Sequence, residues 1–128
     1  MNFLVDTHLL LWASISPKKL SGKARILLED GKNALWFSAV SIWEVAIKQS
    51  LKRDEFRVDP RPLRAALFQM GYTELPVEGR QILDLVGMPY FHTDPFDRLL
   101  VAQAKAEGMA LLTSDRQLAA YGDMVQFV

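Results

Sequence analysis

The sequence has no cysteine among its 128 residues. Disulfide bonds and thiolate metal sites are therefore excluded, so any metal ion that the chain binds must take oxygen or imidazole ligands. Hard divalent cations, which prefer oxygen ligands, become the natural candidates.

Long apolar runs are also missing. No run reaches the ~18 residues that a membrane-spanning helix needs, and no basic segment precedes an apolar one at the N-terminus. We therefore expect no membrane contact, no signal peptide and a cytoplasmic location. Because half of the residues are hydrophobic and 23% are charged, residues 1–128 are expected to form one globular domain.

The chain has no net charge, because 15 basic residues cancel 15 acidic ones. No overall electrostatic field therefore predicts binding to nucleic acid. A local excess of positive charge remains in residues 48–64, which contain Lys48, Lys52, Arg53, Arg57, Arg61 and Arg64. This segment is either an RNA-facing patch or an ordinary solvated face, and the sequence leaves both open.

Apolar segments alternate with segments of helical periodicity along the chain. Strands are predicted at residues 2–5, 35–39, 73–77, 109–113 and 124–128. Helices are predicted at residues 21–29, 41–52, 60–68, 78–86, 95–107 and 116–121. Asp94 is the predicted N-cap of the helix that starts at Pro95, and Gly108 follows its end. This order predicts a three-layer α/β/α sandwich around a mainly parallel five-stranded sheet.

Four acidic residues recur at the ends or starts of these elements. Asp6 and Asp115 follow strands, whereas Glu44 and Asp97 lie in the first turns of helices. Ligands of parallel sheets bind beyond the carboxyl ends of the strands, so we expect these carboxylates to converge there. Clustered carboxylates repel one another unless a divalent cation neutralises them, and Mg²⁺ or Mn²⁺ suits such oxygen ligands. A water held by such an ion can be activated as a nucleophile, which predicts phosphodiester hydrolysis.

Each acid also has a purely structural explanation. Asp6 fits a turn residue at a surface edge, and Asp115 fits the N-cap of a short helix. Glu44 fits a capping box with Ser41, and Asp97 fits a favourable interaction with a helix dipole. These explanations account for each acid singly, but they do not require all of them at one edge of the sheet.

Other chemistry-bearing residues are less informative. His8 and His92 sit beside apolar or aromatic neighbours, and neither is expected to be catalytic. Asp94 is expected to cap a helix, with a supporting role at the site left open, and Thr113 is a candidate to orient Asp115. The seven glycines are scattered, so the sequence has no glycine-rich phosphate loop.

Four blocks of the sequence match a known family. LVDTHLLLW, SAVSIWEVAIK, DPFDRLLVAQA and LLTSD, in this order, resemble the PIN-domain ribonucleases of the VapC toxin type, over residues 2–121. In that family four acids bind Mg²⁺ or Mn²⁺ at the carboxyl edge of a five-stranded parallel sheet. The matching residues here are Asp6, Glu44, Asp97 and Asp115, and Thr113 matches the polar residue two before the last acid.

This resemblance implies a metal-dependent endoribonuclease that is the toxin of a type II toxin–antitoxin pair. It further implies an RNA substrate, a homodimer, and a cognate antitoxin whose peptide tail blocks the cleft. The main alternative is a catalytically inactive PIN-like module that binds RNA or protein. A phosphoacceptor of the haloacid type is disfavoured, because it needs a second aspartate where this chain has His8.

Overall fold

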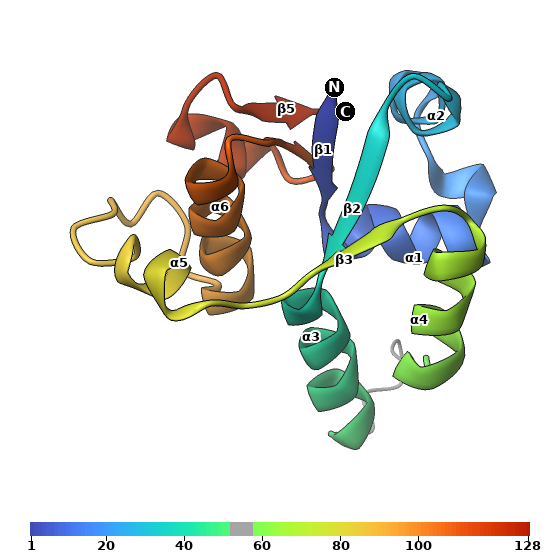
Figure 1. Ribbon diagram of the computed structural model, residues 1–128, viewed down its shortest axis with the longest axis horizontal. Helices are drawn as coiled ribbons and strands as arrows, with labels where there is room; N and C mark the ends of the chain where they lie inside the picture. Colours follow the sequence, from blue (N-terminus) through green and yellow to red (C-terminus); the bar gives the residue numbers. More distant parts are fainter. Residues whose placement is uncertain (52–57) are drawn as a thin grey trace.

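The protein is built on a five-stranded sheet in which every pair of neighbouring strands is parallel. A computed structural model describes residues 1–51 and 58–128 (Figure 1). The strands lie in the order β3-β2-β1-β4-β5, and they are β1 (Asn2–Val5), β2 (Ala34–Ser38), β3 (Thr73–Leu75), β4 (Ala110–Thr113) and β5 (Val125–Phe127). The predicted parallel α/β fold is therefore confirmed.

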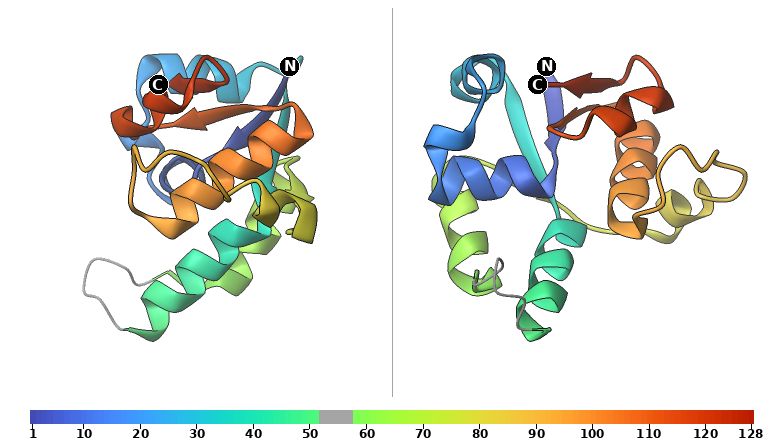
Figure 2. Two further views of the ribbon diagram at one scale, coloured as in Figure 1. Left: turned by 90° about the vertical axis from the view of Figure 1, so that its left-hand side faces the viewer. Right: turned by 180° about the vertical axis from the view of Figure 1, so that it is seen from behind.

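Helices cover both faces of this sheet. They are α1 (Thr7–Ile15), α2 (Gly22–Glu29), α3 (Ala39–Ser50), α4 (Pro60–Gln69), α5 (Gly79–Leu83) and α6 (Pro95–Glu107), with short 3₁₀ helices at Pro17–Lys19 and Arg116–Tyr121. Seen from the front and from behind, α1, α2 and α4 lie on one side and α5 and α6 on the other (Figures 1 and 2). Helix α3 continues from β2 beyond the end of the strand.

The central strand divides the apolar core in two, because successive side chains of a strand point to opposite faces. Phe3 and Val5 pack in the core on the α1 side, whereas Leu4 packs with Leu100 of α6 on the other side. All four side chains are at most 1% exposed. Because β1 is buried on both faces after Asn2, its residues 3–5 are all apolar, and this run ends at Asp6.

Helix α1 is an element that the sequence did not predict. Its residues Leu9, Leu10 and Leu11 are all buried, so the helix is apolar on most of its circumference and shows no helical periodicity. The sequence does carry its start signal, since the side chain of Asp6 caps the helix by accepting a hydrogen bond from the Leu9 amide.

Helix α3 begins two residues earlier than predicted. Its N-cap is Ser38, whose hydroxyl accepts a hydrogen bond from the Val40 amide at 3.0 Å. Ser41 therefore lies inside the helix, and the capping box with Glu44 is wrong. The other boundaries differ by a few residues, and the helix predicted at 78–86 is limited to α5. Among the described residues no helix is long and apolar enough to cross a membrane.

The helix start predicted at Asp94 is confirmed. The Asp94 carboxylate accepts hydrogen bonds from the amides of Phe96 and Asp97, and Pro95 occupies the first helical position. At the other end, Gly108 adopts the left-handed conformation with φ of 65°, which glycine tolerates without strain. These signals fix the start of α6, and so they fix the position of Asp97 in its first turn.

Candidate active site

Asp6 lies at the centre of the carboxyl edge of the sheet, between β1 and α1. It is 2% exposed, so the interpretation as a surface turn residue is wrong. One carboxylate oxygen accepts from the Leu9 amide at 2.9 Å, and the other accepts from the Thr113 hydroxyl at 2.5 Å and the Ser114 amide at 3.1 Å. These bonds join the ends of β1 and β4 and fix the orientation of the carboxylate.

Thr113 links two of the predicted acids. Its hydroxyl donates to Asp6 and accepts a hydrogen bond from the Asp115 amide at 2.9 Å. The Asp115 side chain in turn caps the following 3₁₀ helix through the Gln117 amide, also at 2.9 Å. Asp115 is thus both a helix cap and a neighbour of Asp6, so its structural role does not exclude a role in a site.

Glu44 reaches the site from α3. Although it is a carboxylate, it is 2% exposed. Its Oε1 accepts from the Thr7 hydroxyl at 2.7 Å and its Oε2 from the Lys48 ammonium at 2.6 Å. The Thr7 hydroxyl also lies 2.9 Å from the Ser41 hydroxyl. Because a hydroxyl has one proton and an ionised carboxylate has none, Ser41 donates to Thr7 and Thr7 donates to Glu44.

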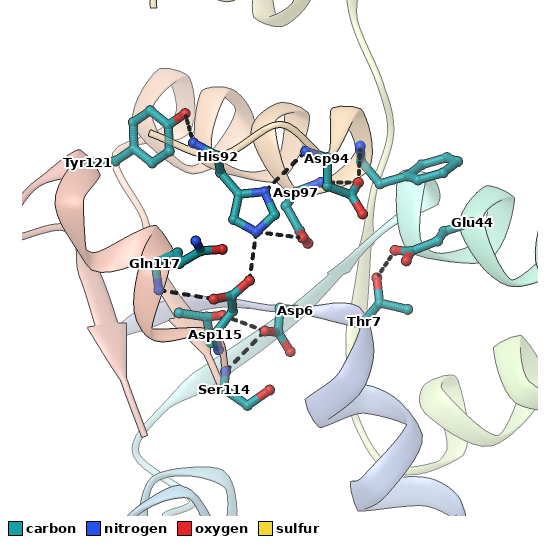
Figure 3. A network of polar contacts seen from close by, with 12 residues as sticks. Asp6, Thr7, Glu44, His92, Asp94, Asp97, Ser114, Asp115, Gln117 and Tyr121 are labelled. Atoms are coloured by element: carbon teal, nitrogen blue, oxygen red, sulfur yellow. Dashed lines mark hydrogen bonds and ion pairs between the residues drawn. The ribbon is translucent and has the colours of Figure 1, made fainter. Parts of the chain in front are cut away.

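His92 lies among the acids, although no local sequence pattern predicts it there. Its Nε2 is 2.7 Å from an Asp115 carboxylate oxygen and 3.7 Å from one of Asp97. His92, Asp97 and Asp115 each have one possible metal-ligand atom, and these three atoms lie within 4.8 Å of one another. Figure 3 shows this group facing the same space as Asp6 and Glu44. The available signal was its position, five residues before Asp97 in the loop that leads into α6.

The second histidine is placed differently. His8 is exposed on α1, and its ring centroid lies 6.1 Å from that of Trp12. His8 is not part of the group of possible metal ligands found among the described residues. From the sequence, neither histidine is expected to be catalytic. Of the two, the structure brings only His92 into the group with Asp97 and Asp115.

Two of the clustered acids, Asp6 and Asp97, have raised pKa values, and burial is the largest cause in both. Burial first, and then the charges of Asp94, Glu44 and Asp6, together raise the pKa of Asp97 to about 7, against an opposing effect of His92. Burial also raises the pKa of Asp6, against its hydrogen bonds to Thr113 and the amides. In the part of the chain that the structure describes, neither Asp6 nor Asp97 forms an ion pair with lysine or arginine. Oxygen donors that have no lysine or arginine partner fit Mg²⁺ or Mn²⁺.

In the described part of the predicted basic segment, each basic side chain pairs with an acid. Arg61 pairs with Asp59, Arg64 pairs with Glu74, and Lys48 pairs with Glu44. Lys52, Arg53 and Arg57 lie outside the described residues. For the described residues of this segment, the interpretation as a charged solvated face fits better than the RNA-facing patch.

The fold and the site together define a parallel α/β domain with a carboxylate-rich site at the carboxyl edge of its sheet. Comparison with known proteins identifies the family of this domain. The sequence model of the PIN domain matches residues 3–124, which is almost the whole chain. The chain belongs to the PIN domain family, as its resemblance predicts.

A curated relative carries the comparison further. Ribonuclease VapC22 of Mycobacterium tuberculosis (strain ATCC 25618 / H37Rv) is 30% identical over 118 residues, which cover 90% of this chain and 88% of the relative.

Solved structures of low sequence identity share the fold. The VapBC2 complex of Rickettsia felis, bound to a promoter DNA fragment, has a TM-score of 0.69 at 14% identity and covers 100% of this chain and 98% of its counterpart. A toxin–antitoxin complex from Klebsiella pneumoniae gives 0.63 at 18% identity, covering 96% and 94%. VapBC-1 from nontypeable Haemophilus influenzae gives a TM-score of 0.61 at 17% identity, covering 100% and 97%.

The raised pKa of Asp97 predicts a pH-dependent stability in metal-free protein. The folded chain holds this proton up to pH ~7, whereas an unfolded aspartate has a pKa of 3.8, so the folded state binds more protons between these values. Stability therefore falls as the pH rises through that window. Asp97→Asn should remove much of this dependence and raise the free energy of unfolding at pH 8 by about 1–2 kcal/mol.

Denaturant unfolding with chelator at pH 5 and pH 8 measures this effect. Asp123→Asn, at an exposed aspartate far from the cluster, is the matched control and should behave as the parent does. A parent chain that is more stable at pH 8, or an Asp97→Asn variant that is less stable there, would contradict the electrostatic account.

Proposed function

We propose that this chain is a metal-dependent endoribonuclease that hydrolyses RNA phosphodiester bonds, as the toxin of a type II toxin–antitoxin pair. The observation that carries the proposal is the group of carboxylates at the carboxyl edge of the sheet, in a PIN-domain chain with a ribonuclease relative. Because its substrate is RNA, the proposed site of action is the cytoplasm.

Asp6 and Asp97 are the proposed direct ligands of the metal, since neither forms an ion pair with lysine or arginine among the described residues. Glu44 and Asp115 complete the site directly or through water. When bound, Mg²⁺ or Mn²⁺ activates a water and stabilises negative charge on the phosphoryl oxygens. The protein holds the ligands in place through Thr113, which donates to Asp6. Asp94 supports the site by capping α6 next to Asp97.

A cognate antitoxin is the proposed protein partner. The solved neighbours include toxin–antitoxin complexes whose toxin subunits share this fold. In our proposal a peptide tail of the antitoxin blocks the cleft that contains the acids. A metal-dependent nuclease active on cellular RNA would need such an inhibitor to be harmless in its host.

A homodimer is the proposed form of the toxin. An apolar hollow of about 370 Å³ opens beside α3, α5 and α6, lined by Ala39, Val40, Trp43, Val77, Ile82 and Leu99. Trp43 is 56% exposed and Ile82 is 45% exposed. An exposed apolar surface of this kind fits a protein interface, and a second copy of the chain is the occupant that we propose.

Nuclease activity is tested with purified chain, single-stranded RNA and Mg²⁺ or Mn²⁺. Excess chelator should abolish cleavage, and Asp6→Asn or Asp97→Asn should each lower the rate by about 100-fold or more, because each removes a ligand charge. Cleavage that persists with chelator, or in both variants, would refute the metal mechanism. A folded parent chain that binds RNA without cutting it would favour the inactive binding module.

Glu44 gives a sharper test, because it is buried and its helix-cap role is excluded. Glu44→Gln keeps an acceptor for Thr7 but removes the negative charge, so we expect a folded protein with cleavage reduced about 100-fold. The matched control is Glu74→Gln, which neutralises an arginine-paired glutamate on β3. Equal activity of both variants would show that the charge of Glu44 is not needed.

Light scattering after size-exclusion chromatography tests the dimer. Ile82→Asp places a charge in the apolar hollow and should convert a dimer to a monomer that still unfolds cooperatively. Ile26→Asp, at a residue of α2 that is 71% exposed, should leave the dimer intact. A monomeric parent chain, or a dimeric Ile82→Asp variant, would contradict this interface.

A further inference from the structure

We propose that His92 is a positioning residue, which holds Asp115 in place for the metal through a hydrogen bond donated by its Nε2, and is not itself a metal ligand. The inference rests on the proposed metal site. It assigns a role to a residue that lies outside the quartet of acids.

The tautomer of His92 follows from its two hydrogen-bond partners. The Asp94 backbone amide donates to Nδ1 at 3.1 Å, so Nδ1 is an acceptor and carries no proton. The proton of the neutral ring is therefore on Nε2, which lies 2.7 Å from the Asp115 carboxylate. Nε2 therefore donates to Asp115, and Figure 3 marks this contact with a dashed line.

This tautomer disfavours direct ligation of a cation. A metal ligand must offer a lone pair, so ligation through Nε2 would move the proton to Nδ1. That proton would then face the amide hydrogen of Asp94, and two donors would oppose each other across 3.1 Å. The amide that precedes α6 thus selects the donor form of the ring.

The backbone of His92 is hydrogen-bonded to the 3₁₀ helix that Asp115 caps. The Tyr121 hydroxyl accepts from the His92 amide at 3.3 Å and donates to the Pro89 carbonyl at 2.7 Å. The Phe91 ring packs edge-on against Tyr121, with centroids 5.1 Å apart. Tyr121 ends the 3₁₀ helix that begins after Asp115. The loop and the short helix therefore hold the histidine and the aspartate in a fixed relation.

Asp115 needs this support more than Asp6 does. Its side chain is 37% exposed, whereas that of His92 is 11% exposed. One carboxylate oxygen is fixed by the Gln117 amide, and His92 engages the other. Each carboxylate oxygen has two lone pairs, so the oxygen that accepts from His92 keeps one for a cation. Hydrogen bonds of this kind fix the orientation of ligands around a metal, and their loss typically weakens affinity by about 10- to 100-fold.

The tautomer is measured first, in metal-free protein, by long-range ¹H–¹⁵N NMR correlation of the imidazole ring. We expect the proton on Nε2, and we expect it to stay there when Mg²⁺ is added. A proton on Nδ1 in either state, or loss of the Nε2 proton on addition of Mg²⁺, would overturn the inference. This measurement needs neither RNA nor catalysis.

Variants then test the role in metal binding, read as free Mn²⁺ by electron paramagnetic resonance without RNA. The amide nitrogen of glutamine can replace Nε2 as a donor, so His92→Gln should bind Mn²⁺ within about threefold of the parent, whereas His92→Ala should bind about 10-fold more weakly. His8→Ala removes the other imidazole and is the control. RNA cleavage should follow the same order, with kcat reduced more than KM is raised.

The outcomes separate the role of His92 from the proposed function. If His92→Ala binds Mn²⁺ and cleaves RNA as the parent does, the positioning role is refuted and the metal site stands. If His92→Gln is as weak as His92→Ala and the parent shows nitrogen coupling to Mn²⁺, the histidine is a ligand and the inference is wrong. A parent chain that binds no Mn²⁺ would overturn both proposals.

Discussion

The burial of neighbouring carboxylates at one edge of the sheet, which also brings them close enough to repel one another, is the constraint on which the rest of this structure depends. Burial, with a smaller contribution from neighbouring acids, raises the pKa of Asp97 to about 7. A fold selected for stability alone would separate such groups or pair them with basic residues. Here Glu44 has Lys48, but Asp6 has hydrogen-bond donors without a lysine or arginine among its described ion pairs. In the proposed function, a cation bound among these acids would supply the missing positive charge.

The parallel sheet provides the rigidity that this repulsion requires. Because every strand runs the same way, the segments after β1 and β4 emerge at one edge, and Thr113 joins them directly. Strand β1 is buried on both faces, so Asp6 has little freedom to move away from its neighbours. Helices bring in the other acids, Asp97 from the first turn of α6 and Glu44 from the second turn of α3. Packing on both sides of the sheet thus fixes charges that would otherwise move apart.

Much of this arrangement is readable in the sequence, because strand ends and helix caps are local signals. The apolar run before Asp6 and the Asp94-Pro95 start predict where two of the acids lie. Helix α1 is missed because a helix buried on most sides loses its amphipathic pattern. The early start of α3 is missed because Ser38 and Ser41 are both good caps, and only packing chooses between them. His92 is missed because its partner Asp115 lies 23 residues further on, and no local pattern reveals that contact.

The most direct measurement of the central claim is crystallographic. Crystals soaked in Mn²⁺ and measured just above the manganese absorption edge locate the ion by its anomalous signal. The account predicts a peak between the carboxylates of Asp6, Asp97 and Asp115, with His92 still bonded to Asp115. An empty site at saturating Mn²⁺, or a peak only at some other group of residues, would contradict it.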